Sequence, residues 1–395
     1  MHLCVRAAAR LAGLVVLVAC GNQSTETTQP PTSGQRRWTI ENNYQVLPAD
    51  AAGPLVVSNG FSTLSAFSLA DGTTKWTVPW LSGMGGVYLL GGLVVAQRDS
   101  LGRGIETYLD AANGQPLWSL QRSPGDQASV VVIGETLIAS IAGTTLVGYD
   151  RLTGREKWRT SLAAPSCNAP VLCEVLRVIG IDGADAYLLR RTTVSTQVIT
   201  VRETGVVRQV EVADESVVRV ASARQLAVIS GTSTFAAWSQ GSTPPAVIDA
   251  MTGAIRARLD LTTLAASGVT STASEFQYSG NGRILFALSL TATGFNLASF
   301  DLVTARLLQS RPLTREQFAL ELTGMCGAEG LSRLTAAGLE YMDLRSGALT
   351  QIPVSGLYDA VRVSGARYTR PLGSDRLLFS SQSNNGLLTG VKCSP

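Results

Sequence analysis

Short runs of apolar and β-branched residues, separated by tight turns, recur along most of the chain. Between residues 130 and 160 the pattern predicts four strands, at Val130–Ile133, Leu137–Ile141, Thr145–Tyr149 and Lys157–Thr160. No amphipathic helical pattern of about 12 residues or more follows residue 20. With 45% apolar residues, 39 glycines and only 15% charged residues, the chain is predicted to be all-β with a large buried core.

A turn motif accompanies these strands and repeats. Its clearest copy consists of Asp150, Thr153-Gly154 and Trp158. Two further copies keep both the turn glycine and the tryptophan, namely Gly72 with Trp76 and Gly114 with Trp118. Four degenerate copies lack the tryptophan and have their turns at Thr204-Gly205, Thr252-Gly253, Thr304-Ala305 and Ser346-Gly347. Successive turns lie 40 to 52 residues apart.

This spacing, with several strands in each period, is typical of a β-propeller. Seven turns predict seven blades, and three further strand-like runs follow the seventh turn, at 360–363, 377–380 and 387–392. Trp38 stands in a segment that resembles the strands of Trp76 and Trp158, but no turn precedes it. We therefore expect an eight-bladed propeller of four-stranded blades in which the N-terminal strand completes the last blade. Seven blades with a terminal extension is the alternative.

Each motif residue has a structural interpretation. The aspartate before the turn can accept hydrogen bonds from turn amides, and glycine tolerates the positive φ that short hairpins require. The tryptophans are expected to pack one blade against the next.

The first 36 residues differ from the rest. Residues 1–19 contain Arg6, Arg10 and an apolar run too short to span a bilayer, which is typical of a signal peptide. The run ends in Leu-Val-Ala followed by Cys20, which resembles the bacterial lipobox and predicts Cys20 as the lipidated first residue. Residues 20–36 are expected to form a disordered tether, and residues 37–395 the propeller. The anchor would lie in the outer face of the plasma membrane or the periplasmic face of an outer membrane.

Charge and histidine content exclude several kinds of function. Removal of Arg6 and Arg10 from 32 basic residues leaves 30 against 29 acidic ones, which gives no support for nucleic-acid binding. The single histidine, His2, lies in the segment expected to be removed. The mature chain therefore cannot form a Ser-His-Asp apparatus or a His-ligated metal site. We expect neither catalytic residues nor a metal.

Four cysteines remain once Cys4 and Cys20 are set aside. Cys167 and Cys173 are close enough in sequence for a small looped disulfide. Cys326 and Cys393 are expected at the same end of neighbouring blades, where a second disulfide would hold the closing blade. Four buried free thiols are the alternative, and four-cysteine zinc ligation is disfavoured because no C-x-x-C units are present.

The units at Trp76, Trp118 and Trp158 resemble the repeats named after pyrroloquinoline quinone (PQQ) enzymes. One branch of that family comprises PQQ-dependent dehydrogenases, and the other comprises non-catalytic propellers such as the BamB lipoprotein. The chain lacks the adjacent Cys-Cys pair typical of the enzymes. Asp99, Asp182 and Asp185 lie in candidate loops, where a solvated turn carboxylate is the favoured interpretation. The resemblance thus implies the non-catalytic branch, with no PQQ or other cofactor.

The expected function is that of a monomeric, membrane-anchored scaffold for an envelope protein. A ligand- or quinone-binding propeller is the alternative, followed by an active oxidoreductase. The loop Pro79-Trp80-Leu81 is a possible binding surface because tryptophan is enriched at interaction hot spots, although blade packing is the favoured role of Trp80. The sequence does not identify the binding face or the partner.

Overall fold

The computed structural model places many short strands, and they belong to one compact unit, Pro31–Ser394. The structure describes the following residues: 36–42, 45–46, 55–59, 63–68, 73–79, 84–100, 103–122, 130–141, 144–162, 175–191, 195–213, 226–238, 244–259, 274–279, 281–291, 294–313, 323–326, 329–335, 338–352, 366–371, 376–381 and 386–392. Among these residues every regular element is a strand, and none forms a helix long and apolar enough to cross a bilayer.

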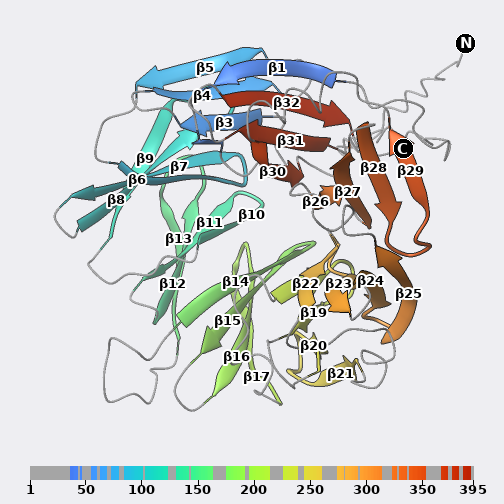
Figure 1. Cartoon of the computed structure of the whole chain (residues 1–395). Coiled ribbons are helices and arrows are strands. Elements are labelled where there is room, and N and C mark those ends of the chain that lie inside the picture. The colour runs from blue at the N-terminus through green and yellow to red at the C-terminus, as the bar shows by residue number, and fades with distance from the viewer. Residues whose placement is uncertain are drawn as a thin grey trace, which may run out of the picture. The chain divides into compact units, whose positions relative to one another are not determined.

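The strands form four-stranded antiparallel sheets, which Figure 1 shows as successive groups of arrows. Sheet 1 comprises β2 (Gln45–Val46), β3 (Leu55–Asn59), β4 (Thr63–Ser68) and β5 (Thr74–Pro79). Sheet 2 comprises β6 (Met84–Leu90), β7 (Leu93–Ser100), β8 (Arg103–Asp110) and β9 (Pro116–Gln121). Sheet 3 comprises β10 (Val130–Ile133), β11 (Thr136–Ile141), β12 (Thr145–Asp150) and β13 (Glu156–Ser161). Sheet 4 comprises β14 (Val175–Asp182), β15 (Asp185–Arg191), β16 (Thr196–Arg202) and β17 (Gly205–Glu211).

The second half of the chain repeats the arrangement. Sheet 5 comprises β18 (Leu226–Ile229), β19 (Thr234–Ala237), β20 (Ala246–Asp249) and β21 (Ile255–Arg258). Sheet 6 comprises β22 (Ser274–Tyr278), β23 (Ile284–Thr291), β24 (Gly294–Asp301) and β25 (Arg306–Leu313). Sheet 7 comprises β26 (Thr323–Cys326), β27 (Gly330–Thr335), β28 (Gly338–Asp343) and β29 (Leu349–Ile352). The mixed sheet comprises β30 (Ala366–Pro371), β31 (Arg376–Ser381), β32 (Gly386–Lys392) and β1 (Arg36–Asn42).

Sheets 1 to 7 follow chain order, whereas the mixed sheet joins the two ends of the sequence. Its strand order is β1-β32-β31-β30, and β1 runs antiparallel to β32 with Trp38 opposite Gly390. The four strands predicted for sheet 3 agree with the observed ones to within one residue at each end. Short apolar runs between glycine-containing turns favour this arrangement because every strand except the two-residue β2 needs only four to eight residues before the chain reverses.

The hydrophobic core lies between sheets rather than within one central body. One cluster packs Leu64 of sheet 1 against Val94 of sheet 2, and corresponding clusters join each later pair of consecutive sheets up to Phe286 of sheet 6 and Met342 of sheet 7. Sheets 2 to 6 are therefore each buried on both faces by their neighbours. Four-stranded meanders stacked face to face in this way form a β-propeller, as the sequence predicts.

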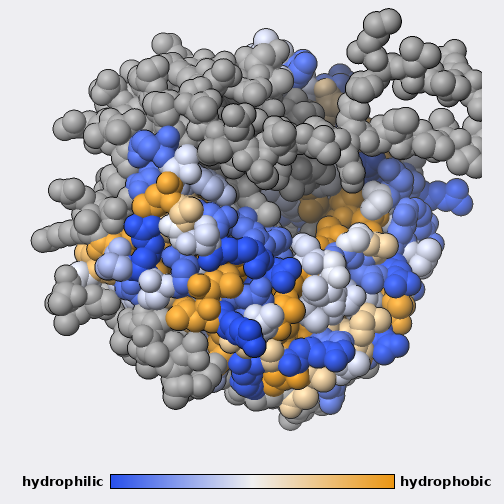
Figure 2. All heavy atoms as spheres, turned by 90° about the vertical axis from the view of Figure 1, so that its right-hand side faces the viewer, coloured by the Kyte–Doolittle hydropathy of each residue, from blue (hydrophilic) through white to orange (hydrophobic). Residues whose placement is uncertain are grey.

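In sheets 2 to 7, the turns from first to second strand and from third to fourth strand lie at the same end of the sheet. Hydrogen bonds link these turns from one sheet to the next, through the pairs Gly91–Arg151, Glu135–Glu203, Asp182–Gly231, Ser230–Asn281 and Asn281–Glu329. The turns of sheets 2 to 7 thus lie on one side of the unit, here called the turn face. Figure 2 shows part of the molecular surface, where hydrophobic residues form separate patches among hydrophilic ones.

Candidate functional site

The aspartate of the repeat organises its own turn, as predicted. The carboxylate oxygen Oδ1 of Asp150 accepts hydrogen bonds from the Thr153 amide at 2.9 Å and the Thr153 hydroxyl at 2.8 Å. The Gly154 amide donates to the Asp150 carbonyl at 2.9 Å. These bonds, that of the Thr153 side chain above all, lower the pKa of Asp150. The same arrangement recurs at Asp249, Asp301 and Asp343, so these carboxylates shape turns.

The repeat tryptophans of sheets 1 to 3 each dock on the turn of the following sheet. The indole N–H of Trp76 donates to the Ala111 carbonyl at 2.8 Å, and that of Trp118 donates to the Arg151 carbonyl at 2.9 Å. Trp158 bonds the Glu203 carbonyl at 2.8 Å. Because the acceptor is always in the third-to-fourth turn of the next sheet, the tryptophans join sheets, as predicted.

Two constraints require glycine in the turn: the close approach of the docked indole and the positive φ of the turn residue itself. Gly154 has φ of 68°, and a Cβ at that position would lie 2.5 Å from the ring of Trp118. Gly114 faces Trp76 in the same way, with 2.7 Å to the ring. A side chain at either position would push the indole away from the turn. Gly205 is looser, since its nearest contact with Trp158 is 3.9 Å.

Later sheets make the corresponding contact without tryptophan. At the junction of sheets 4 and 5, a Cβ on Gly253 would lie 1.9 Å from the carbonyl oxygen of Glu211, so backbone meets backbone. At the junction of sheets 6 and 7, a Cβ on Gly347 would lie 2.4 Å from Oε1 of Gln309. The turn glycine is kept while its partner changes.

Sheet 2 contains a buried polar cluster that the motif analysis missed. Glu106 and Arg122 form an ion pair at 2.5 Å, and both side chains are almost wholly buried. Glu106 also accepts hydrogen bonds from Tyr108 at 2.7 Å, Gln97 at 2.8 Å and Tyr88 at 3.2 Å. Burial, and then the Glu106 carboxylate, raise the pKa of Tyr108. All four donors converge on one carboxylate and form a buried structural network, in which Nε of Arg122 lacks a hydrogen-bond partner among the described residues.

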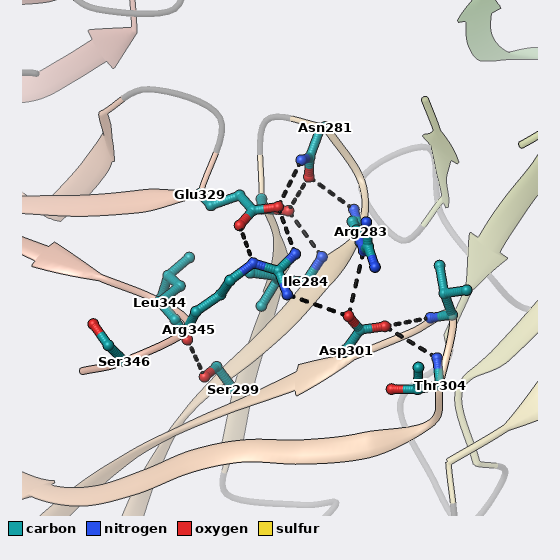
Figure 3. Close-up of polar contacts among 12 residues, drawn as sticks. Asn281, Arg283, Ile284, Ser299, Asp301, Thr304, Glu329, Leu344, Arg345 and Ser346 are labelled. Atoms are coloured by element: carbon teal, nitrogen blue, oxygen red, sulfur yellow. Dashed lines mark hydrogen bonds and ion pairs between the residues drawn. The ribbon is translucent and has the colours of Figure 1, made fainter. Parts of the chain in front are cut away.

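A second polar network lies on the turn face between sheets 6 and 7 (Figure 3). Arg345 donates to Oε1 of Glu329 at 2.8 Å and to Oδ2 of Asp301 at 3.4 Å. Arg283 contacts the same Asp301 oxygen at 3.3 Å, and Asn281 bonds Glu329 at 2.9 Å. The Arg345 hydrogen bond lowers the pKa of Glu329. Although burial acts to raise the pKa of Asp301, the turn amides and the two arginines lower it overall.

Two of the three candidate catalytic aspartates, Asp182 and Asp185, have structural partners. Asp182 accepts hydrogen bonds from the amides of Gly231, Thr232 and Ser233 at 2.6 to 3.1 Å and so caps a turn of sheet 5. Asp185 pairs with Arg202 at 2.5 Å. Asp99 is in β7, and it faces Gly104 in the strand register. Within the described part of the chain, no group of three or more His, Cys, Asp or Glu residues is arranged to hold a metal ion.

Several predicted positions cannot be compared with the structure. Cys20, Cys167, Cys173, Cys393, Gly72 and the pair Trp80-Leu81 lie outside the described residues, while Cys326 is the last residue of β26. The buried Glu106–Arg122 pair had one available signal, a glutamate that follows Ile105 and precedes Tyr108 and Leu109 in the sequence. The Glu329 contact had none, because it joins residues from different repeats.

An N-terminal part of the chain matches a known protein family. Residues 27–173, less than half of the chain, match the model described as outer membrane protein assembly factor BamB. The chain is a β-propeller of PQQ-like repeats. No curated protein sequence matches this chain.

Solved structures share the propeller fold at low sequence identity. The WD40 domain of SCAP from fission yeast has a TM-score of 0.54 at 8% identity, covering 91% of this chain and 97% of that one. The quinohemoprotein alcohol dehydrogenase ADHIIG from Pseudomonas putida has 0.50 at 12% identity, covering 92% and 77%. BamB from Moraxella catarrhalis has 0.49 at 13% identity, covering 91% and 97%. Such identities establish the fold alone.

Proposed function

We propose that this propeller is a lipid-anchored scaffold for protein–protein interaction in the bacterial cell envelope. The observation that carries the proposal is the match of residues 27–173 to the BamB assembly-factor model. Further support comes from the turn face, where Asp182, Asp185 and Asp301 are engaged in structural contacts. A rigid ring with many short loops offers surfaces for recognition.

The ring is proposed to have eight blades and to close through its N-terminal strand. Support comes from the mixed sheet, in which β1 supplies the fourth strand next to β32. Closure of this kind removes the free edge that an open propeller would expose. Deletion of residues 36–42 should therefore expose an edge on β32 and cause aggregation of the purified chain.

The anchor is proposed to be a lipid on Cys20, with residues 20–36 as the tether. Replacement of Cys20 by alanine should abolish incorporation of radiolabelled palmitate and release the chain from the membrane fraction. Cys4→Ala is the matched control, because Cys4 lies in the same N-terminal segment but outside the lipobox. Equal palmitate labelling of both variants would refute the anchor.

Two disulfides, Cys167–Cys173 and Cys326–Cys393, complete the proposed organisation. Support for the second pair comes from chain order: β26 ends at Cys326, β32 ends one residue before Cys393, and β26 contacts β30 and β31. Peptide mapping of the non-reduced protein should yield both pairs. Four alkylated free thiols would show that the pairing is wrong.

Crosslinking in intact cells tests the scaffold role. A photo-reactive residue placed at exposed positions around the full-length chain should yield a reproducible adduct with an envelope protein.

A second candidate function, quinone binding, is favoured by the similarity in fold to ADHIIG. Titration of the purified protein with PQQ and calcium separates the two. A stoichiometric spectral shift with dye reduction would replace the scaffold proposal by an oxidoreductase.

A further inference from the structure

The ion pairs of the turn face differ between the two halves of the propeller. In the pairs made by Arg151, Lys157 and Arg159 of sheet 3, the cations are 24–49% exposed and their carboxylates 41–59%. In the pairs made by Arg202, Arg256, Arg283 and Arg345 of sheets 4 to 7, the arginines are 36–61% exposed and their carboxylates only 5–24%. The carboxylates of the second half lie beneath their arginines.

This layering fixes the guanidinium groups and leaves part of each one accessible. Arg256 directs Nε and Nη2 at Asp249, and Arg283 directs only Nε at Asp301 within the described residues. The remaining N–H groups of these guanidiniums are available to a carboxylate from outside, since a guanidinium carries five donors. A side chain already held by a buried carboxylate loses less rotamer entropy when it binds a second acceptor.

Exposed apolar side chains also lie on the turn face, next to a further arginine, Arg306. In sheet 6 the exposed arginine Arg306 is flanked in sequence by Val303, which is 46% exposed, and Leu307, which is 39% exposed. Arginine next to accessible aliphatic surface is a composition found in protein interfaces, where arginine is enriched. The second half of the turn face therefore combines oriented cations with small apolar contacts.

We propose that the turn face of sheets 5 to 7 docks an acidic segment of a partner protein, whose carboxylates pair with Arg256, Arg283 and Arg306. This inference rests on the proposed scaffold function and names the chemistry of its partner. A protein is favoured over an anionic membrane because the buried carboxylates beneath Arg256 and Arg283 offset the charges of these two arginines at long range. The electric field of such paired charges decreases quickly with distance, so it contributes little to long-range attraction of a membrane. At hydrogen-bonding range the field of the arginines acts at full strength.

A crosslinking experiment on the full-length lipoprotein in intact cells tests the docking surface. A photo-reactive residue at Val303 should form an adduct whose partner peptide, identified by mass spectrometry, is rich in Asp and Glu. The triple variant Arg256→Gln, Arg283→Gln, Arg306→Gln should lower the adduct yield at least fivefold. The matched control Lys157→Gln, Arg159→Gln removes exposed cations of the other half and should leave the yield unchanged. Thermal midpoints of both variants confirm that they are folded.

A probe of known chemistry gives an independent measurement. The purified lipoprotein in detergent should bind a ten-residue glutamate peptide, and the triple variant should weaken that binding about tenfold, while the control double variant does not. A decalysine peptide should not bind to the turn face. Equal weakening in both variants, or no binding of the glutamate peptide, would overturn the proposal.

The remaining outcomes separate this inference from the scaffold function. A protein adduct from a probe at Ser119 of β9, with none from Val303, would leave the scaffold function intact and overturn the turn-face site. Absence of protein adducts from both positions would overturn both. Adducts of Val303 with lipid, together with arginine-dependent binding to vesicles containing phosphatidylglycerol, would replace the acidic protein by a membrane surface.

Discussion

Sheets 1 to 3 and sheets 4 to 6 all contact the turn of the following sheet, but they do so through different chemical groups. In the first group a tryptophan reaches across to the next turn and bonds its backbone carbonyl. In the second group the corresponding positions hold Gln209, Ala257 and Gln309, and the contact is made by backbone, by small side chains or by arginine. The turn built on an aspartate recurs in sheets 2, 3, 5, 6 and 7, whereas in sheet 4 Arg202 pairs directly with Gly205 in a tighter turn. A repeat is therefore defined by its turn, and the residue that docks on the turn can change.

The largest difference is expected when the docking residue is removed. Trp76→Ala deletes a buried indole and its hydrogen bond to Ala111, and should lower the free energy of unfolding by about 3–5 kcal/mol. Gln309→Ala, the matched change in the second group, should cost no more than about 1 kcal/mol. Chemical denaturation of both variants measures the difference. Comparable losses would show that the two junctions depend on their side chains to the same extent.

The backbone junction of the second group predicts the next largest effect. Gly253→Ala places a methyl group against the Glu211 carbonyl oxygen and should cost about 2–3 kcal/mol. Gly183 is the control, since its φ of 61° imposes the same backbone strain but no atom lies within 4 Å of its Cβ position. Gly183→Ala should cost about 1 kcal/mol. Equal losses for the two variants would mean that only backbone conformation, and not the close approach to Glu211, matters at Gly253.

The two groups also differ in what the sequence reveals about them. The first three units display Asp, Gly and Trp at fixed spacing, so the strands of sheet 3 and the role of Trp158 could be predicted from sequence. In the later units the partner of Gly253 is a carbonyl oxygen, which no residue identity encodes. The pair Asn281–Glu329 joins residues 48 apart in the sequence that belong to neighbouring sheets, and this contact is set by how the two sheets pack. Local patterns therefore predict turns, whereas contacts between degenerate repeats require the fold.

Acidification should distinguish the buried carboxylates of the second half from the exposed ones of the first. The folded-state pKa of Asp301 and of Glu329 is lowered, so both stabilise the fold above their unfolded values of about 4. That contribution is lost as the pH falls through the folded pKa values. Between pH 5 and 3, the thermal midpoint of the Arg345→Met variant should therefore fall less steeply than that of the unchanged chain. The corresponding change in the free energy of unfolding is roughly 1 kcal/mol.

Arg159→Met provides the matched comparison for this titration. Its carboxylate partner Glu156 is exposed to solvent, so the pair is screened and the decline should change little. The comparison would fail if the two variants altered the pH dependence equally, because the depth of the carboxylate would then have no influence.

The smallest effect concerns the one motif turn of sheets 2 to 7 that lacks glycine. Ala305 has φ of 54°, where an alanine is less stable than glycine by about 1–2 kcal/mol. Two effects oppose the change to glycine. Glycine gives the unfolded chain more conformational freedom, which lowers stability by about 0.4–1 kcal/mol. The change also removes a partly buried methyl group that packs against the same cluster as Ala257. Relief of backbone strain outweighs these losses, so Ala305→Gly should raise the free energy of unfolding by less than about 1 kcal/mol.

Gly347→Ala, the reverse change in the next sheet, should lower the free energy of unfolding by more, because its new methyl also meets Gln309. A net loss for Ala305→Gly in denaturant titrations would mean that the alanine methyl is itself the docking residue at this junction, in the place where sheets 1 to 3 use tryptophan.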